Sequence, residues 1–143
     1  MKTGVLNDIL RTDMAVESKL REIERLKATR ERVTAVLRGE GGGATGARDR
    51  LGDVTCAILE LEGELEKDIA RSAQLRREFN AIALCAVTPT EYAVLCRRYL
   101  EGQSFGRIAR EMHFSRSAIA KIHARALEKW KQMETKVDKS GQK

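Results

Sequence analysis

The chain has few of the residues that build β-sheets, disulfide frameworks or membrane spans. Among its 143 residues, aromatic side chains make up 4% and there is one proline, whereas charged side chains reach 34%. This composition is typical of long solvated helices. No apolar run approaches the ~18 residues of a membrane-spanning helix, and the N-terminus has no signal-peptide core. The sequence predicts an all-α, cytoplasmic protein of one ordinary domain, or a small domain plus an extended element.

Cysteine and histidine are also scarce. The three cysteines, Cys56, Cys85 and Cys96, have no C-x-x-C spacing and lie inside helical patterns, so we predict reduced packing residues. His113 and His123 have no acidic or cysteine partners at ligand spacing, which argues against a metal site. No carboxylate pair and no nucleophile with a base occurs where a pocket is expected. The sequence therefore predicts no cofactor, no metal and no enzymatic activity.

Two long apolar stripes occupy residues 1–87. We predict helices at about 5–38 and 47–84, because apolar residues recur there at the alternating three- and four-residue spacing of a coiled coil. A glycine-rich turn at 39–46 separates them and allows the chain to reverse. Although Gly41 and Gly46 have the glycine spacing of a phosphate-binding loop, Ala47 and Arg48 replace the required Lys-Ser/Thr. The pattern predicts a long antiparallel, coiled-coil-like hairpin.

The purpose of this hairpin is open at the level of sequence. Its two apolar stripes either bury each other completely, which makes the hairpin a rigid spacer, or form a surface for a homodimer or another partner. A two-helix hairpin buries little area. The polar gap at Asp68 and Ser72 in the second stripe also suggests that a further helix covers part of it.

The positive charge lies in the last third of the chain. The formal net charge is +6, and residues 1–88 carry 15 basic and 15 acidic side chains. Residues 89–143 carry 12 basic against 6 acidic ones, which is the whole excess. Such a segment attracts a polyanion by neutralising phosphates and releasing their counterions, although an anionic membrane surface attracts it too.

Residues 88–133 have the pattern of three helices with a helix-turn-helix. Thr88-Pro89-Thr90-Glu91 combines a capping threonine, a proline at the first helical position and a glutamate three residues after the cap. Ser104 caps a short helix, and the connection His113-Phe114-Ser115 leads to a longer last helix with Trp130 as a core residue. A short helix, a tight turn and a longer second helix are the geometry that inserts a helix into the major groove of DNA. Residues 134–143 are predicted to be a disordered basic tail.

The last helix predicts which side chains face DNA. With Ile119 and Ile122 turned inward, the outward positions of its first turns are expected to read base edges: Arg116, Ser117, Ala120 and Lys121. Side chains on the supporting helices and later in the last helix are expected to contact phosphates, which gives affinity without sequence information: Arg97, Arg98, Ser104, Arg107, Arg110, Arg125 and Lys129.

These residues carry a resemblance to a known family. The runs Arg98–Ser104, Ile108-Ala109 and His123–Leu127, with Ser115, Ile119 and Ile122, are similar to the promoter-reading fourth region of sigma factors. The whole chain resembles small phage-encoded transcriptional activators of the RinA and ArpU type, which also place a charged helical segment before such a helix-turn-helix. The resemblance implies base contacts from the four outward residues, and a role with late genes of a phage or mobile element in the cytosol of a bacterial host.

The first hypothesis is a sequence-specific regulator that binds double-stranded DNA and uses its hairpin to dimerise or to contact RNA polymerase. The second is a viral DNA packaging protein of the small-terminase type, which joins a helix-turn-helix to helical segments that assemble into rings. The third is a helical interaction protein that does not bind DNA.

Overall fold

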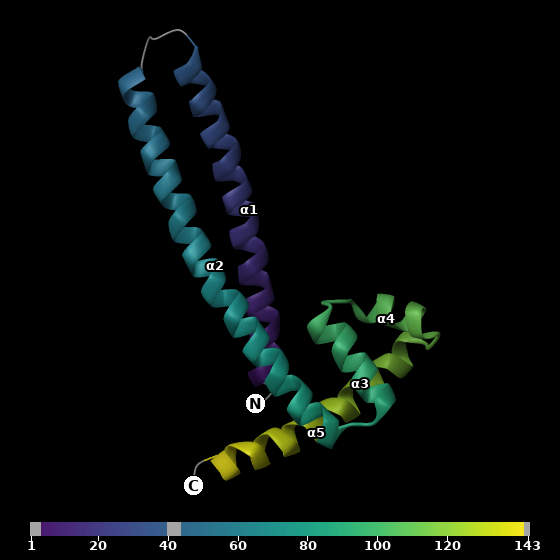
Figure 1. The fold of residues 1–143 in the computed structure, drawn as a ribbon. Helices are drawn as coiled ribbons and strands as arrows, with labels where there is room; N and C mark the ends of the chain where they lie inside the picture. The colour runs from purple at the N-terminus through teal and green to yellow at the C-terminus, as the bar shows by residue number, and fades with distance from the viewer. Residues whose placement is uncertain (1–3, 40–43, 142–143) are drawn as a thin grey trace. The chain divides into compact units, whose positions relative to one another are not determined.

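The structure is a computed structural model that describes residues 4–39 and 44–141. It confirms the all-α fold of a long helical hairpin followed by a helix-turn-helix, and the described residues contain no strand (Figure 1). Residues 40–43 of the predicted glycine-rich turn lie outside the described part. The elements in chain order are α1 (Gly4–Arg38), α2 (Ala44–Ala86), α3 (Pro89–Leu95), η1 (Cys96–Leu100), α4 (Phe105–Met112) and α5 (Arg116–Gly141).

The chain divides into two compact units, and the division falls inside the long helices. One unit is Thr12–Arg71; the other joins Met1–Arg11 to Ser72–Lys143. The sequence places a boundary near residue 87 instead, because periodicity alone shows no change along α1 or α2. The second unit takes both helix ends into its core, so it extends beyond the predicted 88–133 segment.

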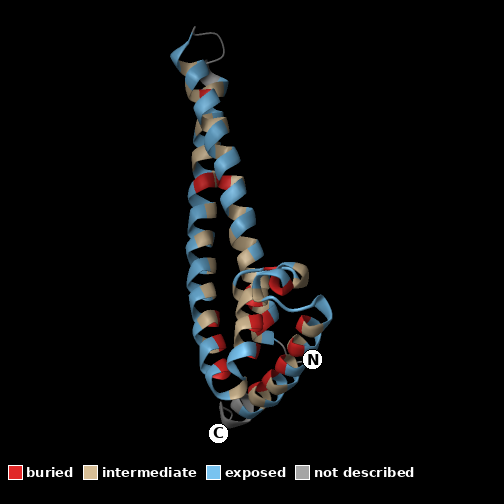
Figure 2. Ribbon diagram, turned by 90° about the vertical axis from the view of Figure 1, so that its right-hand side faces the viewer, coloured by how far each residue is buried: buried red, intermediate tan, exposed pale blue. Residues whose placement is uncertain are grey.

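In the Thr12–Arg71 unit, α1 and α2 run antiparallel with little apolar burial. Its fully buried apolar side chains, among the residues described, are Ile23, Val33 and Ile58, each 5% exposed or less. Figure 2 shows these buried positions as isolated bands along the hairpin. The polar gap at Asp68 is filled by Lys19, whose Nζ lies 2.5 Å from the Asp68 carboxylate. An ion pair inside the hairpin therefore occupies this position of the stripe.

The other unit has a continuous core around Trp130. The indole is fully buried, with its centroid 5.3 Å from the Phe79 ring, and Leu6 and Ile9 of α1 pack into the same cluster. Its Nε1 donates to the Glu134 carboxylate at 2.7 Å, and the other Glu134 oxygen lies 3.4 Å from the backbone nitrogen of Val5. Three segments distant in sequence are thus fastened together by one buried indole and one buried carboxylate.

The helix α5 continues to Gly141, so residues 134–141 differ from the disordered tail that their composition predicts. Glu134 is buried at the start of this stretch, and Thr135 Oγ1 donates to the Lys131 carbonyl at 2.8 Å. Trp130 holds the preceding turn in a helical conformation. The helix can therefore extend to Gly141 without the entropic cost of a new nucleation step. Residues 142–143 lie outside the described part.

The structure corrects part of the prediction that the three cysteines are packing residues. All three are free, but Cys56 and Cys85 are exposed on α2, and Cys96 alone is half-buried. The helical pattern places them on helices without showing that their faces are covered.

No helix in the described ranges is long and apolar enough to cross a membrane.

Candidate DNA interface

A capping box fixes the start of α3. The Glu91 amide donates to Thr88 Oγ1 at 3.3 Å, and the Thr88 amide donates to Glu91 Oε1 at 3.0 Å, so two donors of the first turn are satisfied. The Glu91 side chain is also buried and accepts from Lys129 Nζ at 2.8 Å. Burial raises the pKa of Glu91, but the hydrogen bonds from Lys129 and Thr88 and the Lys129 charge outweigh it and lower the pKa below its ordinary value. This carboxylate therefore links the start of α3 to α5.

After α3 the chain widens into the π-helical turn η1, where the Glu101 amide donates to the Cys96 carbonyl at 3.0 Å. Gly102 then takes the left-handed conformation, with φ of 67°, that glycine adopts without steric cost. Arg76 of α2 donates to the Leu100 carbonyl at 3.3 Å. The wide turn and the glycine end the first helix of the domain and allow α4 to start in a new direction.

The helix-turn-helix consists of α4, a short turn and α5 (Figure 1). Ser104 caps α4 by accepting from the Arg107 amide at 3.2 Å, and Ser115 Oγ accepts from the Ala118 amide at 3.0 Å at the start of α5. Between them His113 adopts φ of 60°, and its amide bonds back to the Ala109 carbonyl. One cluster joins the two helices to α3 and sets their crossing: Val94, Ile108, Ala109, Ile119 and Ile122.

The residues predicted to read bases lie together on the solvent side of α5. Arg116, Ser117, Ala120 and Lys121 are all exposed, while Ile119 is fully buried and Ile122 is 6% exposed. The first turns of α5 thus have one anchored and one free face, which a recognition helix requires.

The residues predicted to contact phosphates fall into four environments. Arg97 and Arg107 both pair with Glu111 of α4, and the Arg107 contact is 3.0 Å long. Lys129 pairs with Glu91, and the Arg125 guanidinium lies 4.0 Å from the same carboxylate. Arg110 is exposed, and no ion pair joins it to another described residue. Part of the predicted basic surface is therefore neutralised within the protein.

Arg98 and Ser104 are held in local structure. The Arg98 guanidinium lies 4.9 Å from the Phe105 ring centroid and donates to the Gln103 carbonyl at 3.1 Å. Phe105 in turn meets the His123 imidazole edge to face. Ser104 uses its hydroxyl as the α4 cap described above, although it remains exposed. These contacts orient the half-buried Arg98 side chain.

A partly buried hydrogen bond joins η1 to α5 beside this group. The Tyr99 hydroxyl and His123 Nε2 are 2.9 Å apart. Burial, assisted by the Arg98 charge, lowers the pKa of His123, and burial raises the pKa of Tyr99 against the opposing effect of Arg98. Both rings are thus uncharged at neutral pH, as a hydrogen bond inside an apolar cluster requires.

Three residues of the interface escaped sequence reasoning. Glu91 reads as a capping residue, and nothing in the local pattern shows its link to Lys129. Val94 is fully buried between α3, α4 and α5. Phe114, in the turn before α5, is 43% exposed and lies two positions before Arg116, the first of the predicted base-reading residues. A large apolar residue inside a polar turn is the signal that marks Phe114.

The Glu91 carboxylate predicts acid sensitivity of this unit. Because its folded pKa lies below the unfolded value of about 4.3, its stabilisation is present above about pH 4.3 and is lost as pH falls through the folded pKa. We expect Glu91→Gln to lower the free energy of unfolding at pH 7 by about 1–2 kcal/mol and to flatten its fall below pH 5. Urea unfolding at several pH values measures both effects.

The matched control for this prediction is Glu111→Gln. Glu111 also has a lowered pKa, chiefly through its hydrogen bond with Arg107, but it lies at the surface, where water screens the pair. A Glu91→Gln profile parallel to that of the unmodified chain would rule out the role assigned to Glu91.

No group of three or more potential metal ligands occurs in the part of the chain that the structure describes.

Comparison with known proteins agrees with the geometry of the helix-turn-helix. No curated protein and no solved structure matches the chain. Residues 83–132, from the end of α2 through most of α5, match the family model of sigma-70, region 4. This match supports a DNA-binding helix-turn-helix of the sigma region 4 type in this segment, and a DNA-binding regulator in general.

Proposed function

We propose that the chain is a sequence-specific, double-stranded DNA-binding transcription regulator that activates late genes of a phage or mobile element in the cytosol of a bacterial host. One observation carries the proposal. The first turns of α5 expose Arg116, Ser117 and Lys121 while Ile119 anchors the opposite face. A helix held in this way can enter a major groove without loss of its packing.

Within this proposal the side chains divide by role. Arg116 and Lys121 donate to guanine O6 and N7, Ser117 bonds an adjacent base, and the Ala120 methyl group contacts a thymine methyl. The phosphate contacts come from the seven residues predicted for this role: Arg97, Arg98, Ser104, Arg107, Arg110, Arg125 and Lys129. Glu111 and Glu91 orient Arg97, Arg107 and Lys129. These pairs reduce the number of cations that must be ordered when DNA binds.

The phage assignment rests on the resemblance to activators of the RinA and ArpU type. The long charged hairpin in front of a sigma-type helix-turn-helix supports it, because both parts are present in this order. Activation would proceed through contact with RNA polymerase. A homodimer formed through the hairpin completes the proposal.

Selection of duplex fragments from random DNA tests the proposal directly. We expect one enriched sequence, bound more tightly than its scrambled version. Enrichment of no sequence would contradict sequence-specific binding. Mass measurement in solution separates the regulator from a packaging protein, because a monomer or dimer fits the regulator and a ring of about eight or more chains does not.

The salt dependence of binding tests the phosphate contacts. Each phosphate neutralised contributes about 0.9 to the slope of log K against log salt. We expect Arg110→Ala to reduce the slope by about 0.9 and to weaken binding equally for the selected and the scrambled duplex. The control is Lys67→Ala, which removes one exposed charge from the hairpin. Equal slopes for Arg110→Ala and Lys67→Ala would remove Arg110 from the phosphate set.

A further inference from the structure

The Thr12–Arg71 hairpin has more apolar surface than its two helices cover. Beyond its three buried side chains, Leu20, Leu59 and Ile69 are 47%, 63% and 53% exposed. Isolated two-helix hairpins of this burial are poorly stabilised, since several kcal/mol of folding free energy require a larger core. Within the described residues of this unit, these side chains therefore have no covering partner.

These three side chains lie on one flank of the hairpin. Lys19 and Asp68 occupy fourth heptad positions and contact each other, and Leu20 and Ile69 each follow directly at the fifth position. In an antiparallel pair, the fifth positions of both helices border the same side of the seam. Leu59 follows the buried Ile58 and borders this side. On the opposite flank Val36 is the large exposed apolar residue at an equivalent position.

Charge is separated along the hairpin. The end next to the turn, residues 25–38 and 46–57, has seven basic and three acidic side chains and is called the basic end. The remaining part, residues 12–24 and 58–71, has four basic and nine acidic side chains and is called the acidic part. On the apolar flank, Lys27 and Arg48 belong to the basic end, and Asp13, Glu62 and Glu66 belong to the acidic part.

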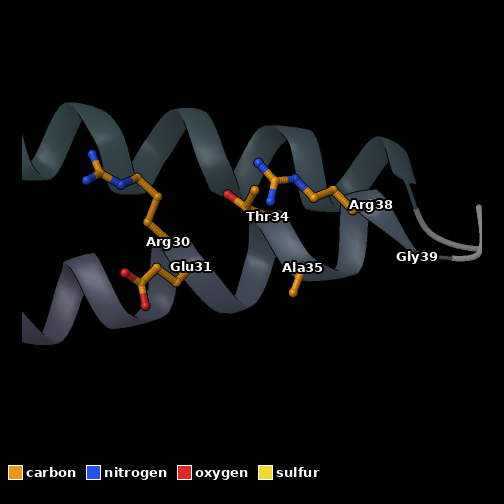
Figure 3. Close-up of a pocket in the computed structure, with 6 residues that line it drawn as sticks. All are labelled: Arg30, Glu31, Thr34, Ala35, Arg38 and Gly39. Carbon is orange, nitrogen blue, oxygen red and sulfur yellow. The ribbon is translucent and has the colours of Figure 1, made fainter.

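The basic end also has a shallow hollow of about 560 Å³ on α1. Figure 3 shows Arg30 and Arg38 extending from one side of α1 and Ala35 from the opposite side. Glu31 also lines the hollow, and no buried polar group is directed into it, so it is not built to hold a small anion. The excess charge of this end is spread along both helices and suits an extended acidic surface.

We propose that a second copy of this chain covers the apolar flank, with the two hairpins antiparallel. This order places each basic end beside the acidic part of the other copy, whereas a parallel pair would oppose like charges at both ends. Leu59 lies about halfway along the hairpin, and Leu20 and Ile69 lie farther from the turn. An antiparallel overlap centred between these two levels brings Leu59 of one copy near Leu20 and Ile69 of the other. The contact is isologous, as in most homodimers.

The inference specifies the homodimer of the proposed function, and it depends on the hairpin rather than on DNA recognition. Light scattering and sedimentation of the full chain should give a mass twice its 16.0 kDa. We expect Lys27→Glu with Arg48→Glu to weaken the dimer at least about tenfold, because each attraction becomes a repulsion at two symmetric places. Glu62→Lys with Glu66→Lys should weaken it similarly. An equimolar mixture of the two variants should restore the dimer.

The matched control is Arg32→Glu with Arg50→Glu, which makes the same charge change on the opposite flank and should leave the dimer constant within about threefold. Equal circular dichroism of all variants shows that the helices persist. Paired nitroxide labels at Thr34→Cys, with the native cysteines replaced by serine, should lie about 25–30 Å apart in the antiparallel dimer, from the ~1.5 Å rise per residue.

Three results would overturn the inference. The first is a monomer at every concentration. The second is a dimer in which the Thr34 labels lie within about 15 Å, which means that the two hairpins are parallel. The third is a lower affinity of the Lys27→Glu, Arg48→Glu variant for DNA at unchanged mass, which would assign the basic end to phosphates. DNA binding by the monomeric variants would leave the proposed recognition helix intact, so the two proposals fail separately.

Discussion

Replacing Trp130 with alanine is expected to lower the free energy of unfolding of the DNA-binding unit by about 3–5 kcal/mol. The indole is fully buried, stacks near Phe79 and joins α5 to the ends of α1 and α2. Its loss leaves a cavity and removes the 2.7 Å hydrogen bond to the buried Glu134 carboxylate. Because Trp130 is the single tryptophan, unfolding in urea is followed by circular dichroism rather than by intrinsic fluorescence.

Trp130→Phe is the matched control, since it retains most of the buried ring and removes the hydrogen bond. We expect a loss of about 1–3 kcal/mol, the usual consequence of losing one buried hydrogen bond and leaving a small cavity. The alanine variant should also expose the N-terminal segment of α1 to proteolysis, because Leu6 and Ile9 lose their neighbour. A cost below about 1 kcal/mol for Trp130→Ala would mean that this core does not hold the unit together.

Removing both donors of the recognition helix, in an Arg116→Ala, Lys121→Ala variant, is expected to weaken binding to the selected duplex by roughly 30-fold to 10⁴-fold. The range follows from about 1–3 kcal/mol of discrimination for each good base contact. Both side chains are exposed, so stability should change by less than about 0.5 kcal/mol. Fluorescence anisotropy titrations with the selected and scrambled duplexes measure the effect.

The ratio of the affinities for these two duplexes separates base contacts from phosphate contacts. Base contacts contribute to the ratio, whereas phosphate contacts contribute equally to both affinities. Arg110→Ala, as a phosphate variant, should lower both affinities and keep the ratio. If Arg116→Ala, Lys121→Ala also keeps the ratio, then α5 does not read the sequence through its first turns, and the proposed function loses its main support.

Local patterns sufficed for much of the helix-turn-helix. The capping box at Thr88, the caps at Ser104 and Ser115 and the buried pair Ile119 and Ile122 all depend on neighbours within a few residues. Backbone capping and helical periodicity are short-range effects, so sequence spacing determines them. The same holds for the all-α fold, since a chain poor in proline and aromatic residues favours long helices.

Tertiary structure alone decided which distant groups meet. Glu91 and Lys129 are 38 positions apart, Trp130 lies against the first helical turns, and Lys19 fills the gap at Asp68. The sequence determined the helices, their caps and the exposed face of α5. It did not determine how far the core extends into α1 and α2, or which cations are paired. Both depend on long-range packing and on the desolvation of charges, and helical periodicity contains no information on either.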